Sequence, residues 1–409
     1  MNKKRTVYLD HNATTYTDSR VIKAMEPYFT KEYGNPSSVY RSAQKNKQKI
    51  EEAREAIKNI LHAPQDSKLI FTGNGSESDN LAIKGIAYAN KQKGKHIITS
   101  QTEHHAVLHT CQYLEKQGFE VTYAPVNNEG IVDVDFIHDA LRDDTILISI
   151  MYANNETGVI QPIEYITQIA HNKNVLLHTD AVQVVGKKKI NIESLGVDLL
   201  TMSAHKFYGP KGVGALYMRK GIKIDPQIHG GDQEFKLRAG TENIAGIIGM
   251  TEALKIADKE CEEKWKKEKE MRDGLEKGLL EKIPDCIVNG HREKRLANTL
   301  NIIVQYVEGE SMLLHLDDAG IAASSGSACT SGSLDPSHVL LAMGISAAIA
   351  HGSLRFSFGK VNTMNDVKYV LEILPPIVEK LRAMSPFGKE KEDIENIEGL
   401  YDPHHEHTH

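Results

Sequence analysis

The stretch VLLHTDAVQVVGKKKINIESLGVDLLTMSAHKFYGPKGVGALYM, residues 175–218, decides the fold class of this chain. It contains three short apolar runs, at 175–181, 199–204 and 214–218, and polar side chains follow the first two where each run ends. Short runs rich in β-branched and aliphatic residues predict buried strands. Toward the N-terminus, four further runs of the same kind lie at 68–72, 96–100, 120–125 and 145–151.

Segments with helical periodicity separate several of these predicted strands. They lie at 76–93, 104–117 and 162–173, and a charged amphipathic helix is expected at 42–60. Apolar strands that alternate with helices predict an α/β domain with a largely parallel sheet. Because ligands of such sheets bind at the carboxyl ends of the strands, we expect the functional site after residues 72, 151, 179 and 204.

The pattern changes near residue 258, where a long charged segment predicts a surface or domain-joining helix. A second, smaller α+β unit is expected beyond it, with strands at 299–306, 321–324 and 353–358 and helices near 309–318, 336–343 and 363–383. We therefore expect a large domain at 16–260, a small domain made of 1–15 and 261–385, and a flexible tail at 386–409. The tail is charged and His-rich, and a solvated segment is the preferred interpretation over a metal site.

Composition excludes several classes of function. The 409 residues carry a net charge of −6, so there is no broad basic surface for nucleic acid or anionic membrane. No apolar run approaches the roughly 20 residues of a membrane helix, and the basic start has no apolar region of a signal peptide behind it. Four cysteines cannot form a disulfide framework. These features predict a cytoplasmic protein.

Lys206 is the sharpest local signal, since it follows a buried strand and precedes a glycine-rich turn. A lysine there can form a Schiff base, although a solvated loop lysine is the simpler interpretation of that residue alone. Asp180 ends the neighbouring predicted strand and could pair with the pyridine nitrogen of pyridoxal phosphate, or cap a helix. Because neighbouring strand ends converge on one crevice, the pair favours the cofactor.

Three further loops carry polar residues that could serve a cofactor. The turn at 73–78, Gly-Asn-Gly-Ser-Glu-Ser, could bind a phosphate at the start of a helix, fits a dinucleotide fingerprint poorly, and could be a capping turn with Ser76 as the cap. His104 and His105 open a predicted helix, where a histidine could stack on a ring or cap the helix, and capping or surface exposure is preferred for His105. Asn155 could donate to a cofactor oxygen or serve a turn.

Cys329 differs from the other cysteines because it lies among small residues in SSGSACTSGS, 324–333. Such a thiol is accessible, as a nucleophile must be, and an incidental loop cysteine is the alternative. Cys111, Cys261 and Cys286 are interpreted as structural or incidental. Arg355 stands in an apolar strand, where either a substrate carboxylate or an internal salt bridge would satisfy its charge.

Together these motifs resemble the cysteine desulfurases of the NifS/IscS kind, within the class-V aminotransferase group of fold-type I pyridoxal phosphate enzymes. The resemblance runs from about residue 8 to about 385 and rests on motifs in the same order. These include YLDHNATT (8–15), ESDNLAIKG (77–85), ANNETGVIQP (153–162), HTDAVQ (178–183), SAHKFYGPKGVG (203–214), RAGTEN (238–243) and SSGSACTSGS (324–333). It implies a mainly parallel seven-stranded sheet in the large domain and a small α+β domain carrying the Cys329 loop.

The resemblance also implies a role for each candidate residue. Lys206 would bind the cofactor covalently and move protons, His104 would stack on the ring, and Cys329 would attack the substrate sulfur. Asp180 and Gln183 would contact the ring nitrogen and the ring hydroxyl oxygen. Arg355 and Asn155 would bind the substrate. The phosphate would be bound by Gly75, Ser76, Ser203, His205 and, from the second subunit of a homodimer, Thr241. The turn at 73–76 and Tyr40 depart from the usual family pattern.

The predicted activity is conversion of L-cysteine to L-alanine, with the sulfur carried as a Cys329 persulfide to an iron–sulfur scaffold protein. No resident metal is expected, although Cys329 could contact a cluster on a partner. A selenocysteine lyase would share the cofactor residues, and a fold-type I aminotransferase would not need Cys329. A nucleotide-binding or scaffold protein without the cofactor is disfavoured by the Lys206 and Asp180 pairing.

Overall fold

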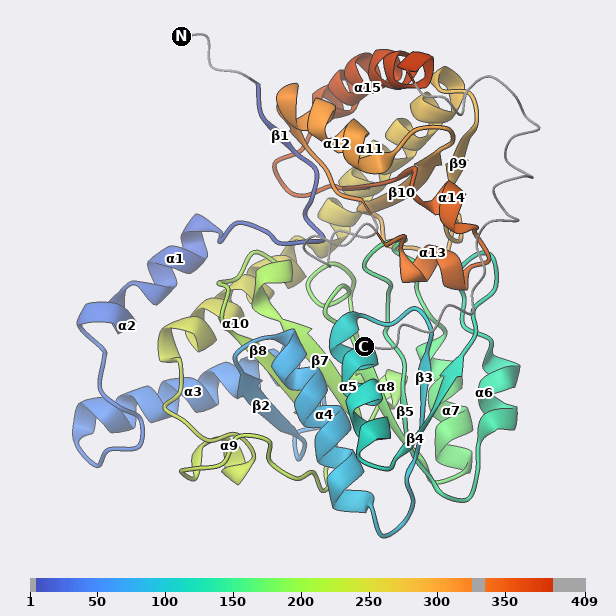
Figure 1. Ribbon diagram of the computed structural model, residues 1–409. Helices are drawn as coiled ribbons and strands as arrows, with labels where there is room; N and C mark the ends of the chain where they lie inside the picture. Colours follow the sequence, from blue (N-terminus) through green and yellow to red (C-terminus); the bar gives the residue numbers. More distant parts are fainter. Residues whose placement is uncertain (1–4, 326–334, 385–409) are drawn as a thin grey trace.

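A seven-stranded sheet organises the larger part of the molecule in the computed structural model, which describes residues 5–325 and 335–384 (Figure 1). The strand order is β2-β8-β7-β6-β5-β3-β4. Only β8 runs antiparallel to its neighbours, so the expected mainly parallel sheet is confirmed. The strands are β2 (Lys68–Thr72), β3 (His96–Ser100), β4 (Glu120–Ala124), β5 (Thr145–Ser149), β6 (Leu176–Asp180), β7 (Leu199–Ser203) and β8 (Gly214–Met218).

Helices cover both faces of this sheet because successive strand residues point to opposite sides. Ile97 of β3 belongs to the cluster that includes α4 (Gly75–Asn90) and α5 (His105–Lys116). Its neighbour Ile98 belongs to the cluster on the other face, with α3 (Arg41–Ile60), α7 (Ile163–Asn172) and α10 (Ile244–Lys259). The shorter helices of this part are α1 (Ser19–Met25), α2 (Pro27–Thr30), α6 (Val134–Ala140), α8 (Ile192–Leu195), the 3₁₀ turn η1 (Ala204–Lys206) and α9 (Gln233–Lys236).

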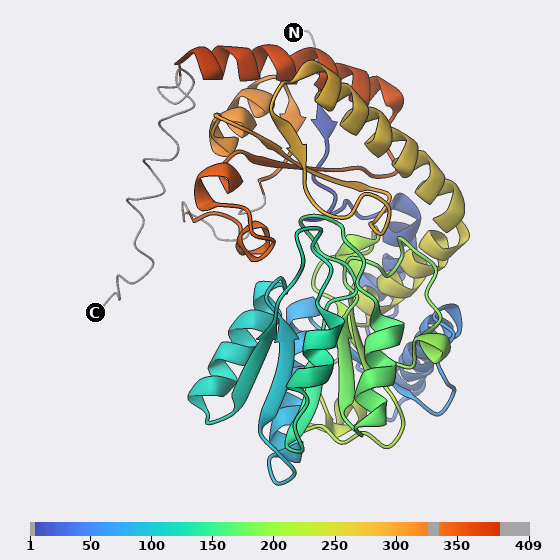
Figure 2. The same ribbon diagram turned by 90° about the vertical axis from the view of Figure 1, so that its right-hand side faces the viewer.

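A smaller antiparallel sheet, ordered β12-β10-β9, lies above the first in Figures 1 and 2. Its strands are β9 (Cys286–Val288), β10 (Thr299–Val304) and β12 (Ser353–Ser357). The helices of this part are α11 (Cys261–Lys282), α12 (Gly309–Asp318), α13 (His338–Ala342), α14 (Ala347–Ala350) and α15 (Met364–Met384). Leu275, Leu300, Phe356 and Val370 share one buried cluster here, which joins α11 and α15 to the sheet.

The segment from residue 7 to residue 15 ties the two sheets together. It begins as β1 (Val7–Tyr8), which pairs in parallel with β11 (Ile321–Ala322). Ser357 N then donates to Leu9 O at 2.7 Å, and Thr15 N donates to His205 O at 3.0 Å. Residues 10–13 are thereby placed at the carboxyl ends of β6 and β7.

The expected domain boundaries fall near the starts of α1 and α11, at Ser19 and Cys261. Cys329 and the predicted tail at 386–409 lie outside the described residues. Among residues 5–325 and 335–384, no helix combines the length and the apolar character needed to cross a membrane.

Candidate active site

A cavity of about 360 Å³ opens at the carboxyl ends of the parallel strands, where the sequence predicted a site. All the predicted site residues except Thr241 and Cys329 line it: Gly75, Ser76, His104, Asn155, Asp180, Gln183, Ser203, His205, Lys206 and Arg355. Thr241 is exposed and lines a separate cavity of about 120 Å³ beside Gly73 and Arg238. Cys329 is outside the described residues.

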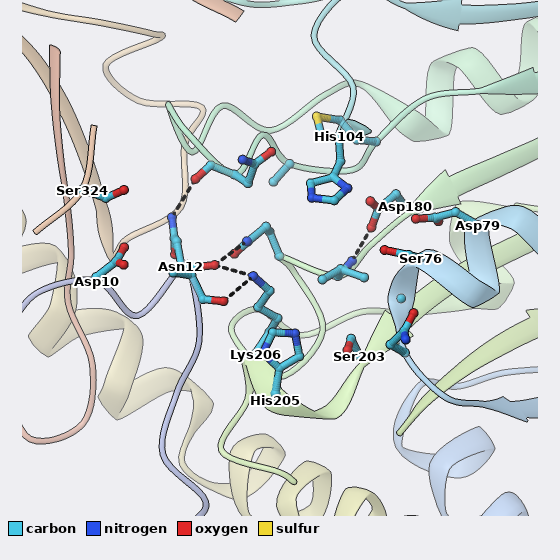
Figure 3. Close-up of a pocket in the computed structure, with 18 of the residues that line it drawn as sticks. Asp10, Asn12, Ser76, Asp79, His104, Asp180, Ser203, His205, Lys206 and Ser324 are labelled. Atoms are coloured by element: carbon cyan, nitrogen blue, oxygen red, sulfur yellow. Dashed lines mark hydrogen bonds between the residues drawn. The ribbon is translucent and has the colours of Figure 1, made fainter. Parts of the chain in front are cut away.

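Lys206 reaches into this cavity from η1, directly after β7. Its Nζ donates to the carbonyl oxygen of Asn12 at 2.5 Å and to that of Ala13 at 2.9 Å, as the dashed lines of Figure 3 show. The amine is therefore held by backbone oxygens of the N-terminal segment. Such contacts orient the side chain toward the cavity.

Asp180 ends β6 inside the cavity and is buried. Val182 N donates to its Oδ1 at 2.9 Å. Burial raises the pKa of Asp180 to about 6, while this hydrogen bond and the nearby Lys206 act in the opposite direction. A cationic ligand group would stabilise the carboxylate further, because no ionised carboxyl is favoured in a buried position without a partner.

Two more buried carboxyl groups lie close behind Asp180. Burial and the charge of Asp180 raise the pKa of Asp79, and burial raises the pKa of Glu103 to about 8. Asp79 lies next to Asp180 in Figure 3 and also contacts His178, with 3.6 Å between Oδ1 and Nε2. Burial therefore disfavours the ionised form of all three carboxyl groups of this cluster.

The opposite end of the cavity has the features of an anion site. Helix α4 begins there at Gly75, and a Cβ at this position would approach Val182 Cγ2 to 2.9 Å. Within the described residues, the buried Ser203 Oγ has no hydrogen-bond partner. The expected alternative of Ser76 as the helix cap is wrong, because the Asn74 side chain accepts from Glu77 N at 2.8 Å.

Two histidines line the cavity as neutral rings. His104 caps α5, since its Nδ1 accepts from Ala106 N at 3.1 Å, and burial lowers its pKa to about 4. Capping and contact with a ring are therefore compatible roles. His205 shares a hydrogen bond of 3.1 Å between its Nδ1 and Thr14 Oγ1, and burial lowers its pKa to about 4 as well. His105 is half-buried and contacts His109 and His338.

Arg355 crosses from β12 into the cavity and is buried. Its Nη2 pairs with Asp10 Oδ1 at 2.7 Å, and its Nη1 donates to Asn155 O at 3.1 Å. Its Nε is buried without a partner in the described part of the chain. The salt bridge that the sequence left open is thus present, and one donor of the guanidinium remains to be satisfied.

The sequence analysis assigned no role to Asp10, Asn12 or Lys187, although Asp10 and Asn12 line the cavity and Lys187 donates to Asn12. Asp10 and Asn12 stand in the motif YLDHNATT, directly after the two residues of β1. Asp10 and Asn12 could have been found in the sequence, because they are polar residues that follow a short apolar run. For Lys187 no local signal exists, since it stands in a run of three lysines at 187–189.

This donor set fits pyridoxal phosphate. A lysine and a buried carboxylate face one space, and a helix start with an unpartnered hydroxyl lies at the other end. These groups complement an aldehyde, a protonated ring nitrogen and a phosphate. No cluster of three or more His, Cys, Asp or Glu that could hold a metal ion occurs within 5–325 and 335–384.

Comparison with known proteins identifies relatives over nearly the whole chain. Residues 7–370 match the aminotransferase class-V family. A protein named cysteine desulfurase IscS from Methanosarcina thermophila is 55% identical over 384 residues, covering 94% of this chain and 95% of its own length. A protein of that name from Dictyoglomus turgidum is 53% identical, covering 95% and 98%.

Solved structures show the same likeness. A NifS-like protein superposes with a TM-score of 0.87 at 39% identity, covering 92% of this chain and all of the other. A second structure, SspA in complex with cysteine, gives a TM-score of 0.77 at 36% identity and covers 86% of this chain and 99% of the other.

Proposed function

The chain belongs to the aminotransferase class-V family, and from this premise we propose that it is a pyridoxal phosphate-dependent cysteine desulfurase, which converts L-cysteine to L-alanine. One observation carries the proposal: Lys206 and Asp180 face a single cavity whose far end has the start of α4 and the free hydroxyl of Ser203. Relatives about half identical over nearly the full chain are named for this activity, and one structural neighbour contains cysteine.

Different residues of the cavity bind different parts of the cofactor. When bound, pyridoxal phosphate withdraws electrons through its protonated ring from a substrate carbon that loses a proton. Asp180 keeps the ring nitrogen protonated, and His104 contacts the ring face. Gly75, Ser76, Ser203 and His205 bind the phosphate. Lys206 would hold the cofactor through Nζ, and the same amine is placed to move protons at the substrate Cα.

Arg355 and Asn155 orient the substrate. The guanidinium of Arg355 binds the α-carboxylate of L-cysteine, because its planar fork matches a carboxylate. Asp10 already pairs with this guanidinium at 2.7 Å. The substrate carboxylate therefore shares Arg355 with Asp10 or displaces it, and the buried unpartnered Nε is the donor that remains.

Cys329 takes the sulfur. Its thiolate attacks the sulfur of the bound cysteine, so that the S–S bond forms while the Cβ–S bond breaks. The electron pair of the broken bond stays on Cβ, which takes a proton and becomes the methyl group of alanine. Sulfur is thus oxidised to the persulfide level and carbon is reduced, and no outside oxidant is needed. The glycine and serine residues around Cys329 in the sequence suit a thiol that must meet both substrate and acceptor.

We further propose that the enzyme acts as a homodimer in the cytoplasm and delivers sulfur to an iron–sulfur scaffold protein. Helices α1 and α2 and the segment after them expose large apolar side chains that a second copy would cover: Ile22, Phe29, Tyr33, Val39 and Tyr40. Thr241 is exposed as well and would reach the phosphate of the partner subunit. Light scattering of the purified protein tests the dimer.

The activity is tested by the visible absorption spectrum of the purified protein before and after L-cysteine is added. We expect a band from the bound cofactor that changes on addition, with alanine formed and sulfide released in the presence of a reductant. Cys329→Ala should keep the spectral change and lose turnover. A protein that cannot be loaded with pyridoxal phosphate would contradict the proposal, and a fully active Cys329→Ala variant would favour an aminotransferase.

A further inference from the structure

Lys187 is a buried cation next to the cavity, and no step proposed above uses it. It follows β6 on the turn after Asp180 and is 4% exposed. Its Nζ donates to Gln183 Oε1 at 2.7 Å and to Asn12 Oδ1 at 2.8 Å. Burial lowers its pKa well below the ordinary value for lysine. The charged groups that act on it are Lys206, Lys264, Arg355 and Glu268.

The contact with Lys187 fixes which way the Gln183 amide points. Gln183 Oε1 accepts from Lys187 Nζ at 2.7 Å, and the carbonyl oxygen of Asn12 on the other side can only accept, so both neighbours place the amide oxygen toward Lys187. Gln183 Nε2 then lies on the other side, where it donates one hydrogen to Asn12 O at 3.0 Å. Because Gln183 lines the cavity, the second hydrogen of Nε2 is the one it can offer to a ligand.

Lys187 constrains Asn12 in the same way. Asn12 Oδ1 accepts from Lys187, so Asn12 Nδ2 is turned toward Asn155 O and Thr299 Oγ1, at 3.2 and 2.8 Å. The backbone oxygen of Asn12 holds the Nζ of Lys206. Lys187 thus contacts the side chains of both Gln183 and Asn12, and at Asn12 Oδ1 it acts together with Asn298 Nδ2, which donates at 3.0 Å.

We propose that Lys187 is a positioning residue, which holds the Gln183 amide with its Nε2 donor toward the cavity so that it binds an anionic oxygen on the cofactor ring. The inference rests on the proposed function, since it requires pyridoxal phosphate in this cavity. Without Lys187, Gln183 Oε1 loses its donor and only the contact with Asn12 O holds the amide, so Nε2 is directed less firmly at the ring oxygen.

A double-mutant cycle on cofactor affinity tests this role. The full-length protein is freed of cofactor, and the dissociation constant of pyridoxal phosphate is measured for the wild type, Gln183→Ala, Lys187→Met and the double variant. The loss of one hydrogen bond to a charged oxygen weakens binding about tenfold. We expect about tenfold in each single variant and about tenfold, not a hundredfold, in the double variant, because coupled residues are not additive.

Lys264→Met is the matched control. Lys264 is also buried, but its Nζ donates to Gly186 O at 2.8 Å and it has no bond to Gln183 or Asn12 within the described structure. The affinity of the Lys264→Met variant for pyridoxal phosphate should stay within about twofold of the wild type. Lys187→Met and Gln183→Ala should also shift the visible band of the bound cofactor by the same amount, whereas Lys264→Met should not move it.

A roughly hundredfold loss of cofactor affinity in the double variant would overturn the inference. Wild-type affinity in Lys187→Met would overturn it as well. If Lys187→Met does not fold, Gln183→Glu replaces it, since a carboxylate accepts from Lys187 and has no donor for the ring. Wild-type affinity in Gln183→Glu would be equally contrary. A wild-type protein that binds no pyridoxal phosphate would refute the proposed function itself, which separates the two failures.

Discussion

Glu234 and Arg54 form a buried ion pair that supports the turn leading to Thr241. The Glu234 carboxylate accepts from Arg54 Nη1 at 2.8 Å, from Arg54 Nη2 at 3.1 Å and from Phe71 N at 2.8 Å. Glu234 and the two residues after it have φ values of 44°, 61° and 65°, the left-handed region. Because non-glycine residues rarely adopt this region, the contacts of Glu234 must stabilise the turn against it.

We predict that Glu234→Ala lowers the free energy of unfolding by about 4 kcal/mol, because removal of one partner of a buried pair costs about 3–5 kcal/mol. In the Glu234→Ala variant, Arg54 keeps its bonds to Leu69 O and to the exposed Glu51. The expected loss of unfolding free energy therefore lies below the upper limit of about 5 kcal/mol. Arg54→Met should cost about 3 kcal/mol, since Glu234 keeps the bond from Phe71 N. The double variant should cost about 4 kcal/mol, about 3 less than the sum, because it leaves no uncompensated buried charge.

Urea unfolding followed by far-ultraviolet circular dichroism and by the fluorescence of Trp265 measures these differences. Glu52→Gln is the control on the same helix, because the exposed pair of Lys49 and Glu52 at 2.6 Å should contribute nothing measurable. Additive losses in the double variant would show that the two side chains act independently. That result would refute the reasoning, whatever the size of the single effects.

Three other variants probe the substrate site, the buried carboxyl cluster and a strained turn. Arg355→Ala should raise the KM for L-cysteine about a hundredfold, because a charge-assisted contact of about 3 kcal/mol is lost. Titration should show an unchanged affinity for pyridoxal phosphate. Equal losses of substrate affinity and cofactor affinity would contradict the assignment of Arg355 to the substrate. Burial raises the pKa of Glu103 from 4.5 to about 8, so between these values only the unfolded chain releases this proton and the wild type loses stability as pH rises. Glu103→Gln should therefore gain stability relative to the wild type from pH 4.5 to about 8 in urea titrations, and a pH-independent difference would argue against a protonated Glu103. Gly186→Ala should lower the free energy of unfolding by about 3 kcal/mol or more in the same assay, since a Cβ there, at φ 74°, would lie 2.4 Å from the Cβ of Phe207. Gly212 has a similar φ of 78° with nothing within 4 Å of an added Cβ, so Gly212→Ala should cost about 1 kcal/mol. Equal losses of stability in the two variants would refute the steric argument.

Local patterns were sufficient to predict the large sheet. The runs at 68–72, 96–100 and 214–218 coincide with β2, β3 and β8, and the others differ from the observed strands by one or two residues at an end. These strands are buried on both faces, so each appears in the sequence as a continuous apolar run. The helix expected at 309–318 matches α12 as well. The resemblance to cysteine desulfurases is confirmed by the alignments over nearly the full chain.

Most of the predictable site residues stand at the end of a strand or shortly after it, and Arg355 was recognised as a charge inside an apolar strand. Asp180 and Lys206 have the first of these positions, and both line the cavity. The importance of Asn12 depends on partners 143 to 287 residues away in the sequence, Asn155, Lys187 and Thr299, which no local pattern reveals. The alternative of Ser76 as the helix cap was wrong because Asn74 and Ser76 are both good capping residues, and only the observed backbone distinguishes them.

The path of residues 7–15 has a consequence for the order in which the enzyme can be built. The ribosome produces this segment before the large sheet, yet its partners at residues 321, 322 and 357 are produced after that sheet. The strands of the large sheet, 68–218, have all left the ribosome long before then. On a growing chain Lys206 consequently lacks the carbonyl groups of Asn12 and Ala13 in their final position. The reactive centre is thus completed last, after the small sheet has formed, so a prematurely terminated chain ending before residue 321 would retain the large sheet and lack a finished centre.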